Sequence, residues 1–233
     1  MEIAIIHGQL HKGSTYHISS MLKDRLAEPD SVVHEYFMPA DAPGFCMGCF
    51  RCIIQGESNC PHADKVQRIA ESMISSDVII IDSPTYCLEM SGQLKTLFDH
   101  LGYMWLSHRP RKEMFKKIGV VISTAAGLGA KRVTKSIAKQ MFWWGIPKVF
   151  KLPVSVSAMS WGDVSDKIKL NATKKVDSLS NLIKRGAGSA KPGFATRFLF
   201  SVMRTMQSKN TWNLVDRDHW KSNGWLLKER PWR

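Results

Sequence analysis

The sequence predicts a three-layer α/β sandwich built around a five-stranded parallel sheet. Three observations predict it. Short runs rich in Val and Ile alternate with amphipathic helical patterns, several runs are almost continuously apolar, and small and polar residues follow the runs. Continuous apolar runs are typical of strands that are covered on both faces. Alternating strands and helices form right-handed β-α-β units that bind ligands at the carboxyl ends of their strands.

Each element is expected from its own pattern. The strands are expected at residues 2–7, 31–38, 77–84, 117–124 and 148–156. Helices, with apolar residues three or four positions apart, are expected at 14–27, 63–75, 91–101, 131–144 and 165–184. His7 ends the first apolar run, so we expect it to be a hydrogen-bonded core histidine.

The last fifth of the chain differs from the rest. The small-residue segment 185–193 separates an expected core domain, 1–185, from a C-terminal extension, 186–233, with a helix and a Trp-rich tail. Apolar residues recur every four positions in that helix, as Phe194, Phe198, Val202 and Met206. We expect the helix and the tail to dock on the core or on a partner subunit, with a membrane surface as the alternative.

The chain of 233 residues carries a formal net charge of +13, which is unevenly placed. Residues 109–151 contain eleven Lys or Arg side chains and one acidic residue, Glu113. Such a face can attract a phosphorylated cofactor, an acidic protein, an anionic membrane or nucleic acid, or it can be a solvated surface. No zinc-finger, helix-turn-helix or RNA-binding aromatic motif accompanies the charge, so nucleic acid is the least favoured partner.

The sequence starts on an apolar run without a basic leader, and no stretch of about 18 consecutive apolar residues occurs. We therefore expect a cytoplasmic protein. Because the cytoplasm is reducing, disulfides are not expected among the cysteines clustered in residues 45–61.

The loop after the first strand has the composition of a phosphate-binding turn. Gly8 and Gly13 flank it, and Ser14 and Thr15 follow at the expected start of a helix. The triphosphate-binding pattern would need Lys directly after Gly13, so a phosphomonoester fits better than a polyphosphate. An ordinary turn capped by Ser or Thr is the alternative interpretation.

Two further loops complete a candidate ligand site. Residues 83–100 follow the third strand, where Pro84 stiffens the strand exit and Tyr86 can present a flat apolar face. Residues 123–132 follow the fourth strand, and their small side chains leave room for a planar ring. Together the three loops predict a phosphate clamp beside a slot for a planar heterocycle.

Four cysteines fall within residues 45–61, as Cys46, Cys49, Cys52 and Cys60. Their spacing, C-x2-C-x2-C-x7-C followed by Pro, is close to the spacing with which bacterial ferredoxins hold iron–sulfur clusters. Zinc sites more often use two separated cysteine pairs. The same side chains can also pack as small apolar groups beneath the loop. A cluster and packed thiols both remain open, with zinc third.

These motifs together resemble those of the flavodoxin-fold NAD(P)H-dependent FMN reductases, and within them the iron–sulfur flavoprotein-like branch. The resemblance rests on Gly8 with residues 13–15, the four-cysteine block, 83–86, 91–95 and 98–99. It covers about residues 1–185 and excludes the Trp-rich tail. It implies a flavodoxin-like fold with strand order 2-1-3-4-5, and FMN as the cofactor.

The resemblance also implies residue roles. The FMN phosphate would be held by His11, Ser14 and Thr15. The isoalloxazine ring would be lined by Pro84, Thr85, Tyr86, Cys87 and Leu88, and its far side by Thr124, Ala125, Ala126 and Gly127. The family usually shows Ser-Pro-Arg after the first Gly, where this chain has Gln9-Leu10-His11, so the phosphate loop would make fewer charged contacts.

The implied activity is that of an FMN-dependent NAD(P)H oxidoreductase, a homodimer or tetramer that passes electrons to a small-molecule or protein acceptor. A [4Fe-4S] cluster on Cys46, Cys49, Cys52 and Cys60 is implied beside the flavin. The cofactor carries this chemistry, so no acid–base catalytic residue is expected.

Two alternative functions remain. One is a non-catalytic flavin or iron–sulfur electron carrier, and the other is a basic metal-holding module that binds nucleic acid. The strong positive charge disfavours the carrier, because shuttle flavodoxins are generally acidic.

Overall fold

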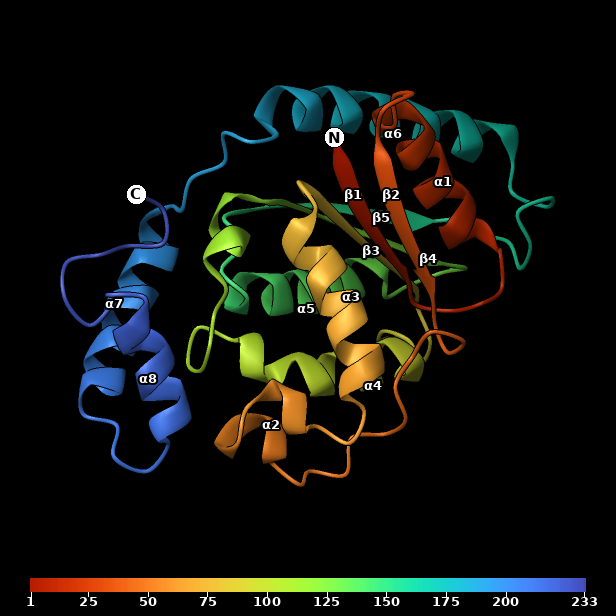
Figure 1. The fold of residues 1–233 in the computed structure, drawn as a ribbon. Helices are drawn as coiled ribbons and strands as arrows, with labels where there is room; N and C mark the ends of the chain where they lie inside the picture. Colours follow the sequence, from red (N-terminus) through yellow and green to blue (C-terminus); the bar gives the residue numbers. More distant parts are fainter.

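A computed structural model describes residues 1–233 and contains one five-stranded parallel sheet (Figure 1). The strands are β1 (Glu2–His7), β2 (Val32–Phe37), β3 (Val78–Pro84), β4 (Ile118–Ala125) and β5 (Lys148–Ser155). Their order in the sheet is β2-β1-β3-β4-β5, and all four pairings are parallel. The predicted fold class and strand order are therefore confirmed.

Helices cover both faces of the sheet. The face with α1 (Ser14–Leu26) and α6 (Asp166–Gly186) buries Ile3 and Ile5 of β1. The opposite face, with α3 (Ala63–Ser75), α4 (Gly92–His100) and α5 (Ala130–Trp143), buries Ala4 and Ile6. Successive residues of a strand point to opposite faces, so a doubly covered strand must be apolar throughout.

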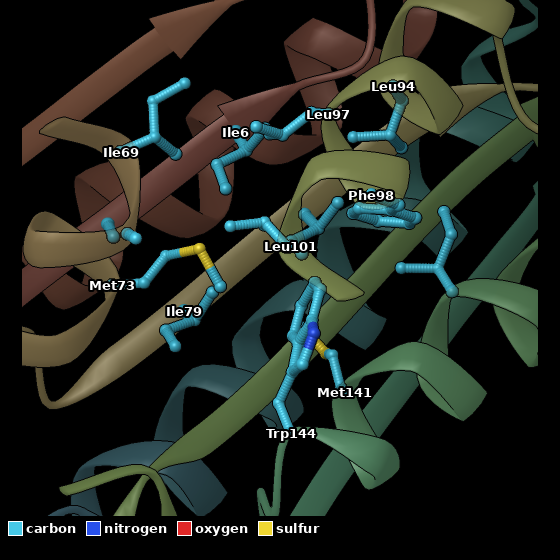
Figure 2. Packing of buried hydrophobic residues seen from close by; sticks show 14 of the residues in the cluster. Ile6, Ile69, Met73, Ile79, Leu94, Leu97, Phe98, Leu101, Met141 and Trp144 are labelled. Atoms are coloured by element: carbon cyan, nitrogen blue, oxygen red, sulfur yellow. The ribbon is translucent and has the colours of Figure 1, made fainter. Parts of the chain in front are cut away.

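The core beneath α3, α4 and α5 is the larger of the two (Figure 2). Leu97 and Phe98 of α4 pack there with Met141 of α5 and with Trp144, whose ring meets Phe98 edge-on at a centroid distance of 5.3 Å. Trp144 is fully buried, so it belongs to the core. This packing fixes α4, whose two ends border the loop after β3 and the cysteine block.

Five short elements have no counterpart among the predicted ones. They are α2 (Arg51–Ile54), α8 (Leu214–Ser222) and the 3₁₀ helices η1 (Glu57–Asn59), η2 (Leu101–Met104) and η3 (Lys112–Lys116). Elements of three to nine residues are too short to show a helical repeat of apolar residues. They form the part of the molecule that connects the cysteine block to the C-terminal extension.

The C-terminal extension forms α7 (Phe194–Ser208) and α8, which lie together at the margin of the molecule away from α1 and β2 (Figure 1). Their apolar contacts form a small core with the segment between α4 and β4. Its buried members are Leu106, Phe115, Phe200, Met203, Trp220 and Trp225. The ring of Phe200 lies tilted against that of Trp220 at a centroid distance of 4.7 Å and meets Phe115 edge-on at 5.9 Å. The extension is thus packed on the rest of the chain.

The helix and tail dock on the core, as expected, but not through the four-residue repeat. That side of α7 is exposed, with Phe194 at 83% and Phe198 at 61%. The docked face instead contains Thr196, Phe200, Met203 and Gln207. No helix of the structure is both long enough and apolar enough to cross a membrane.

Candidate functional site

Three loops meet at the carboxyl edge of the sheet. They follow the strands β1, β3 and β4, which are neighbours in the sheet, and run over residues 8–13, 85–91 and 126–129. Loops that leave the same ends of adjacent parallel strands lie side by side. The structure therefore gathers most of the sequence-predicted cofactor residues at one edge.

The first loop leads into the amino end of α1. A Cβ on Gly8 would lie 2.7 Å from the carbonyl oxygen of Asp82, so only glycine fits where the loop crosses β3. Gly13 precedes α1, and no side chain caps the helix. The first backbone N–H groups of α1 are therefore free to bind an anion. Thr15 is buried at this end, and His11 is exposed beside Gly13.

Hydrogen bonds tie the three loops to one another. The hydroxyl groups of Thr15 and Thr124 lie 2.6 Å apart, which joins the first loop to the end of β4. The N–H of Thr85 donates to the carbonyl of Thr124 at 2.9 Å. The Tyr86 hydroxyl donates to the side chain of Gln9. These contacts fix the relative positions of the three loops.

Close backbone approach shapes the second and third loops. Gly129 has a φ of +104°, and a Cβ there would lie 2.6 Å from Cγ2 of Thr85. Cys87 and Leu88 have φ values of +49° and +66°, which form a tight turn that costs non-glycine residues conformational energy. Strained turns of this kind cluster at ligand sites.

Each loop leaves at least one apolar side chain uncovered. These are Leu10, Tyr86, Leu88 and Leu128, all about half exposed or more. Ala126 and Gly127 are exposed among them with Cys87, whereas Pro84, Thr124 and Ala125 are buried at the strand ends. Exposed apolar groups arranged around small residues form a surface that a flat ring can cover.

His7 lies beneath this edge, as predicted, and is only 2% exposed. Its Nδ1 is 2.6 Å from Asp82 and its Nε2 is 2.9 Å from Glu35. Burial lowers the pKa of His7, but the hydrogen bonds to the two carboxylates outweigh it and raise the pKa to about 9. His7 is therefore protonated at neutral pH, and it joins β1 to β2 and β3 directly before Gly8.

The cysteine block forms a separate site at the end of α4 that is distal to the sheet edge. Gly48 and Phe50 have φ values of +64° and +56°, and they reverse the chain before α2. All five cysteines of the chain are free. The four cysteines of the block line one cavity of about 310 Å³, together with His62 and His100.

Two thiols of the block have defined surroundings. Cys60 Sγ lies 3.6 Å from Nδ1 of His100, whose Nε2 is 2.8 Å from the carbonyl oxygen of Gly44. Burial lowers the pKa of His100, so the neutral ring donates to Gly44 and can accept from the thiol. Burial and the neighbouring cysteines raise the pKa of Cys52 to about 11. Cys52 is thus a neutral thiol unless a metal displaces its proton.

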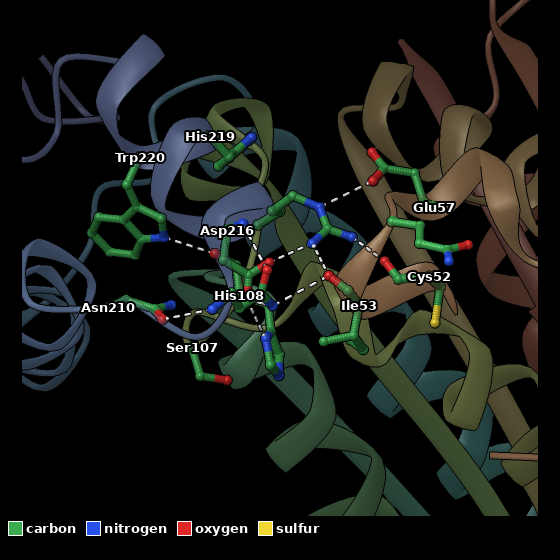
Figure 3. Close-up of polar contacts among 12 residues, drawn as sticks. Cys52, Ile53, Glu57, Ser107, His108, Asn210, Asp216, His219 and Trp220 are labelled. Carbon is green, nitrogen blue, oxygen red and sulfur yellow. Dashed lines mark hydrogen bonds and ion pairs between the residues drawn. The ribbon is translucent and has the colours of Figure 1, made fainter. Parts of the chain in front are cut away.

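Polar contacts around the buried Arg109 tie the block to the C-terminal extension, and Figure 3 shows the residues on both sides of them. Arg109 is 4% exposed and donates to the carbonyl oxygens of Cys52 and Ile53 in α2. It also pairs with Glu57 at 3.0 Å and with the fully buried Asp216 of α8. The carbonyl groups at the end of α2 therefore bind a guanidinium group that α8 holds in place.

The far carboxylate oxygen of Asp216 completes the network. It lies 2.6 Å from Nδ1 of His108 and 2.8 Å from the Asn213 amide, which also donates to the Ile53 carbonyl at 3.2 Å. We name these residues the Arg109–Asp216 network: Cys52, Ile53, Glu57, His108, Arg109, Asn213 and Asp216. Beside it, an apolar cavity of about 570 Å³ lies between the cysteine block and the extension, with Phe50, Tyr103, Trp105 and Trp212 in its wall.

Comparison with known proteins decides the family. A family model described as NADPH-dependent FMN reductase matches residues 1–159. The chain belongs to the NADPH-dependent FMN reductase family. The matched region contains all three loops and the whole cysteine block, and it ends before α6.

Curated relatives and a solved structure that shares the fold are also similar to this chain. An iron-sulfur flavoprotein of Archaeoglobus fulgidus is 27% identical over 188 residues, which cover 78% of this chain and 80% of the relative. One from Methanocaldococcus jannaschii is 30% identical over 99 residues, 42% of this chain and 50% of the relative. An azoreductase of Bacillus anthracis shares the fold, with a TM-score of 0.62 and 13% identity over 78% of this chain and 99% of its own.

The residues present fit the two cofactors that this reductase family and its iron-sulfur relatives imply. An uncapped helix start beside an apolar surface suits the phosphate and the ring of FMN. In the block, no three His, Cys, Asp or Glu side chains lie close enough together for a single metal ion. Zinc would hold its sulfur ligands within about 4 Å of one another. Four thiols around one cavity fit the larger iron–sulfur cluster better.

Several residues of these sites were not predicted from the sequence. Arg109 was counted with the basic stretch, and nothing in the sequence pairs it with Asp216, 107 positions away. His100 ends an amphipathic helix, where a histidine is unremarkable. Only His62 carries a local signal, since it follows Cys60 and Pro61 directly.

Proposed function

We propose that this reductase binds FMN on the three connected loops and oxidises NAD(P)H there. The observation that supports it is the hydrogen-bonded contact between Thr15 and Thr124, which sets an anion-binding helix start next to an exposed apolar surface. FMN, when bound, supplies hydride acceptance from the nicotinamide and onward electron transfer. The protein supplies binding, orientation and a fixed electrostatic environment.

The roles of the loops follow from their chemistry. The N–H groups at the start of α1 and the hydroxyl groups of Ser14 and Thr15 would hold the phosphate, with His11 beside them. Tyr86 and Leu88 would cover one part of the ring, and Ala126 and Gly127 would border the rest. Backbone N–H groups in 85–88 and 124–127 would stabilise negative charge on the reduced ring.

A basic cluster at the start of α5 supports NADPH as a donor. Lys131, Arg132 and Lys135 lie around a surface hollow directly after Gly129 of the third loop. Their positive charges would attract the additional 2′-phosphate of NADPH. Arg132 is partly neutralised by Glu89, so Lys131 and Lys135 carry the attraction.

We further propose that Cys46, Cys49, Cys52 and Cys60 hold a [4Fe-4S] cluster. The cluster would supply one-electron transfer. The guanidinium group of Arg109 fixes the backbone of α2 and places a positive charge beside the thiolates, while His100 positions Cys60. A homodimer or tetramer would cover the exposed side of the flavin loops.

The first test is flavin reduction. When the FMN-loaded protein is mixed with NADPH under nitrogen, we expect the yellow absorbance to disappear within seconds. The rate should exceed that with NADH and fall as salt screens Lys131 and Lys135. Slow bleaching with both nucleotides would instead support the electron carrier, and a protein that binds no FMN would contradict the proposal altogether.

The second test counts iron. We expect anaerobically reconstituted protein to contain roughly four irons and four sulfides per chain, and Cys49→Ser or Cys60→Ser to lower the iron count to near zero. Cys87→Ser is the matched control, because Cys87 is exposed and lies outside the block. Reconstituted wild-type protein without sulfide would mean that the block consists of free thiols, and flavin reduction would be unaffected.

A further inference from the structure

Helix α7 has two apolar faces, and the rest of the chain covers only one. Thr196, Phe200, Met203 and Gln207 are buried against α8 and the segment before β4. The other face contains Phe194, Phe198, Val202 and Met206, which are 83%, 61%, 38% and 58% exposed. We call these four residues the exposed stripe. Two phenylalanines of one helix stacked in solvent, at 6.1 Å between centroids, are not expected of a surface that stays in water.

The surface beside the stripe is basic. Arg197 and Arg204 lie on one flank, and α7 contains no acidic residue. Arg204 donates to the carbonyl of Leu227, which is 76% exposed and therefore adds apolar surface at this flank. Residues 186–233 contain nine Lys or Arg and three Asp or Glu, a net charge of +6 out of the +13 of the whole chain. About a fifth of the chain thus carries nearly half of its charge.

We propose that the exposed stripe binds the surface of an anionic lipid bilayer, with α7 lying parallel to it. Phe194, Phe198 and Val202 would enter the boundary between headgroups and acyl chains. Arg197 and Arg204, with Lys191 and Lys209 at the two ends of the helix, would contact the negatively charged headgroups. A helix with aromatic residues on one face and cations beside them has the composition of interfacial helices.

Charge argues against a second copy of the chain as the occupant. A symmetric dimer through the stripe would bring two surfaces of +6 together, and like charges oppose that contact. A lipid surface supplies the opposite charge together with an apolar phase. This inference is independent of the proposed function, since neither the flavin loops nor the cysteines take part in it.

Co-sedimentation of the 233-residue chain with lipid vesicles tests the proposal. We expect binding to vesicles of phosphatidylcholine mixed with phosphatidylglycerol, weak binding to phosphatidylcholine alone, and release at high salt. The triple variant Phe194→Ser, Phe198→Ser, Val202→Ser should lower the partition coefficient at least about tenfold. Lys191→Gln with Lys209→Gln should weaken binding to the anionic vesicles only.

The matched control is Met159→Ser, Leu170→Ser, Leu182→Ser, which removes three exposed apolar side chains outside the extension. It should bind as the wild type does, and thermal unfolding should show that both triple variants are folded. Equal losses in the two triple variants, or a wild type that stays in the supernatant, would overturn the proposal. The proposal would also be overturned if analytical ultracentrifugation showed that the wild type is a dimer and that the stripe variant is a monomer.

Discussion

Asp216→Ala is expected to lower the free energy of unfolding by about 3–5 kcal/mol, because it leaves the buried guanidinium group of Arg109 without its fully buried counter-charge. His108 and Asn213 lose a hydrogen-bond acceptor in the same step. Denaturant unfolding monitored by tryptophan fluorescence measures the change, since Trp220 of the same helix donates to the carbonyl of His108 at 2.7 Å.

The variant should also loosen the cysteine block. Arg109 would lose the partner that holds it against the carbonyl groups of Cys52 and Ile53, so Cys52 should react faster with a thiol reagent in the metal-free protein. Asp218→Ala is the matched control: Asp218 is an exposed acidic residue of the same helix, and its loss should change stability by less than about 0.5 kcal/mol. Equal effects of the two substitutions would show that the network does not stabilise the extension.

The sheet and the loops could be predicted because their signals are local. Strands buried on both faces must be nearly continuous runs of Val and Ile, and β3 and β4 contain no exposed residue. The loop residues follow these strands directly, so once the strands are predicted the sheet topology places Ser14, Tyr86 and Gly127 at one edge. These predictions need no knowledge of contacts between distant residues.

The network and the orientation of α7 could not be predicted because they depend on tertiary partners. Arg109 looks like any other cation of a basic stretch until Asp216 is placed beside it. In α7, Phe194 and Phe198 form a regular four-residue repeat, yet Phe200 and Met203 face the core. A helix with apolar residues on both sides does not indicate which side is covered.

His7 is expected to make stability fall as the pH rises from about 6.5 to 9. Its pKa is raised to about 9 in the folded protein, above the ordinary value of 6.5. The stabilisation from the protonated ring is therefore complete below pH 6.5 and is lost as the pH passes 9. A rise from 6.5 to about 9 corresponds to roughly 3 kcal/mol. Glu35 works in the other direction: its pKa is lowered, chiefly by the hydrogen bond to His7, so its contribution is lost only in acid.

His7→Gln isolates this contribution. We expect the variant to be less stable than the wild type near pH 6 and the difference between them to shrink toward pH 10, because the wild type loses its buried charge while the variant has none to lose. Subtracting the two unfolding curves removes the titration of groups that both proteins share. His34→Gln, a partly exposed histidine of β2, should show a difference that is small at every pH. A pH-independent difference for His7→Gln would mean that the ring is neutral between Asp82 and Glu35.

Because Gly8 follows His7 directly, loss of the charge on His7 should also weaken FMN binding at high pH. The reason is that the turn that begins the phosphate loop would become looser.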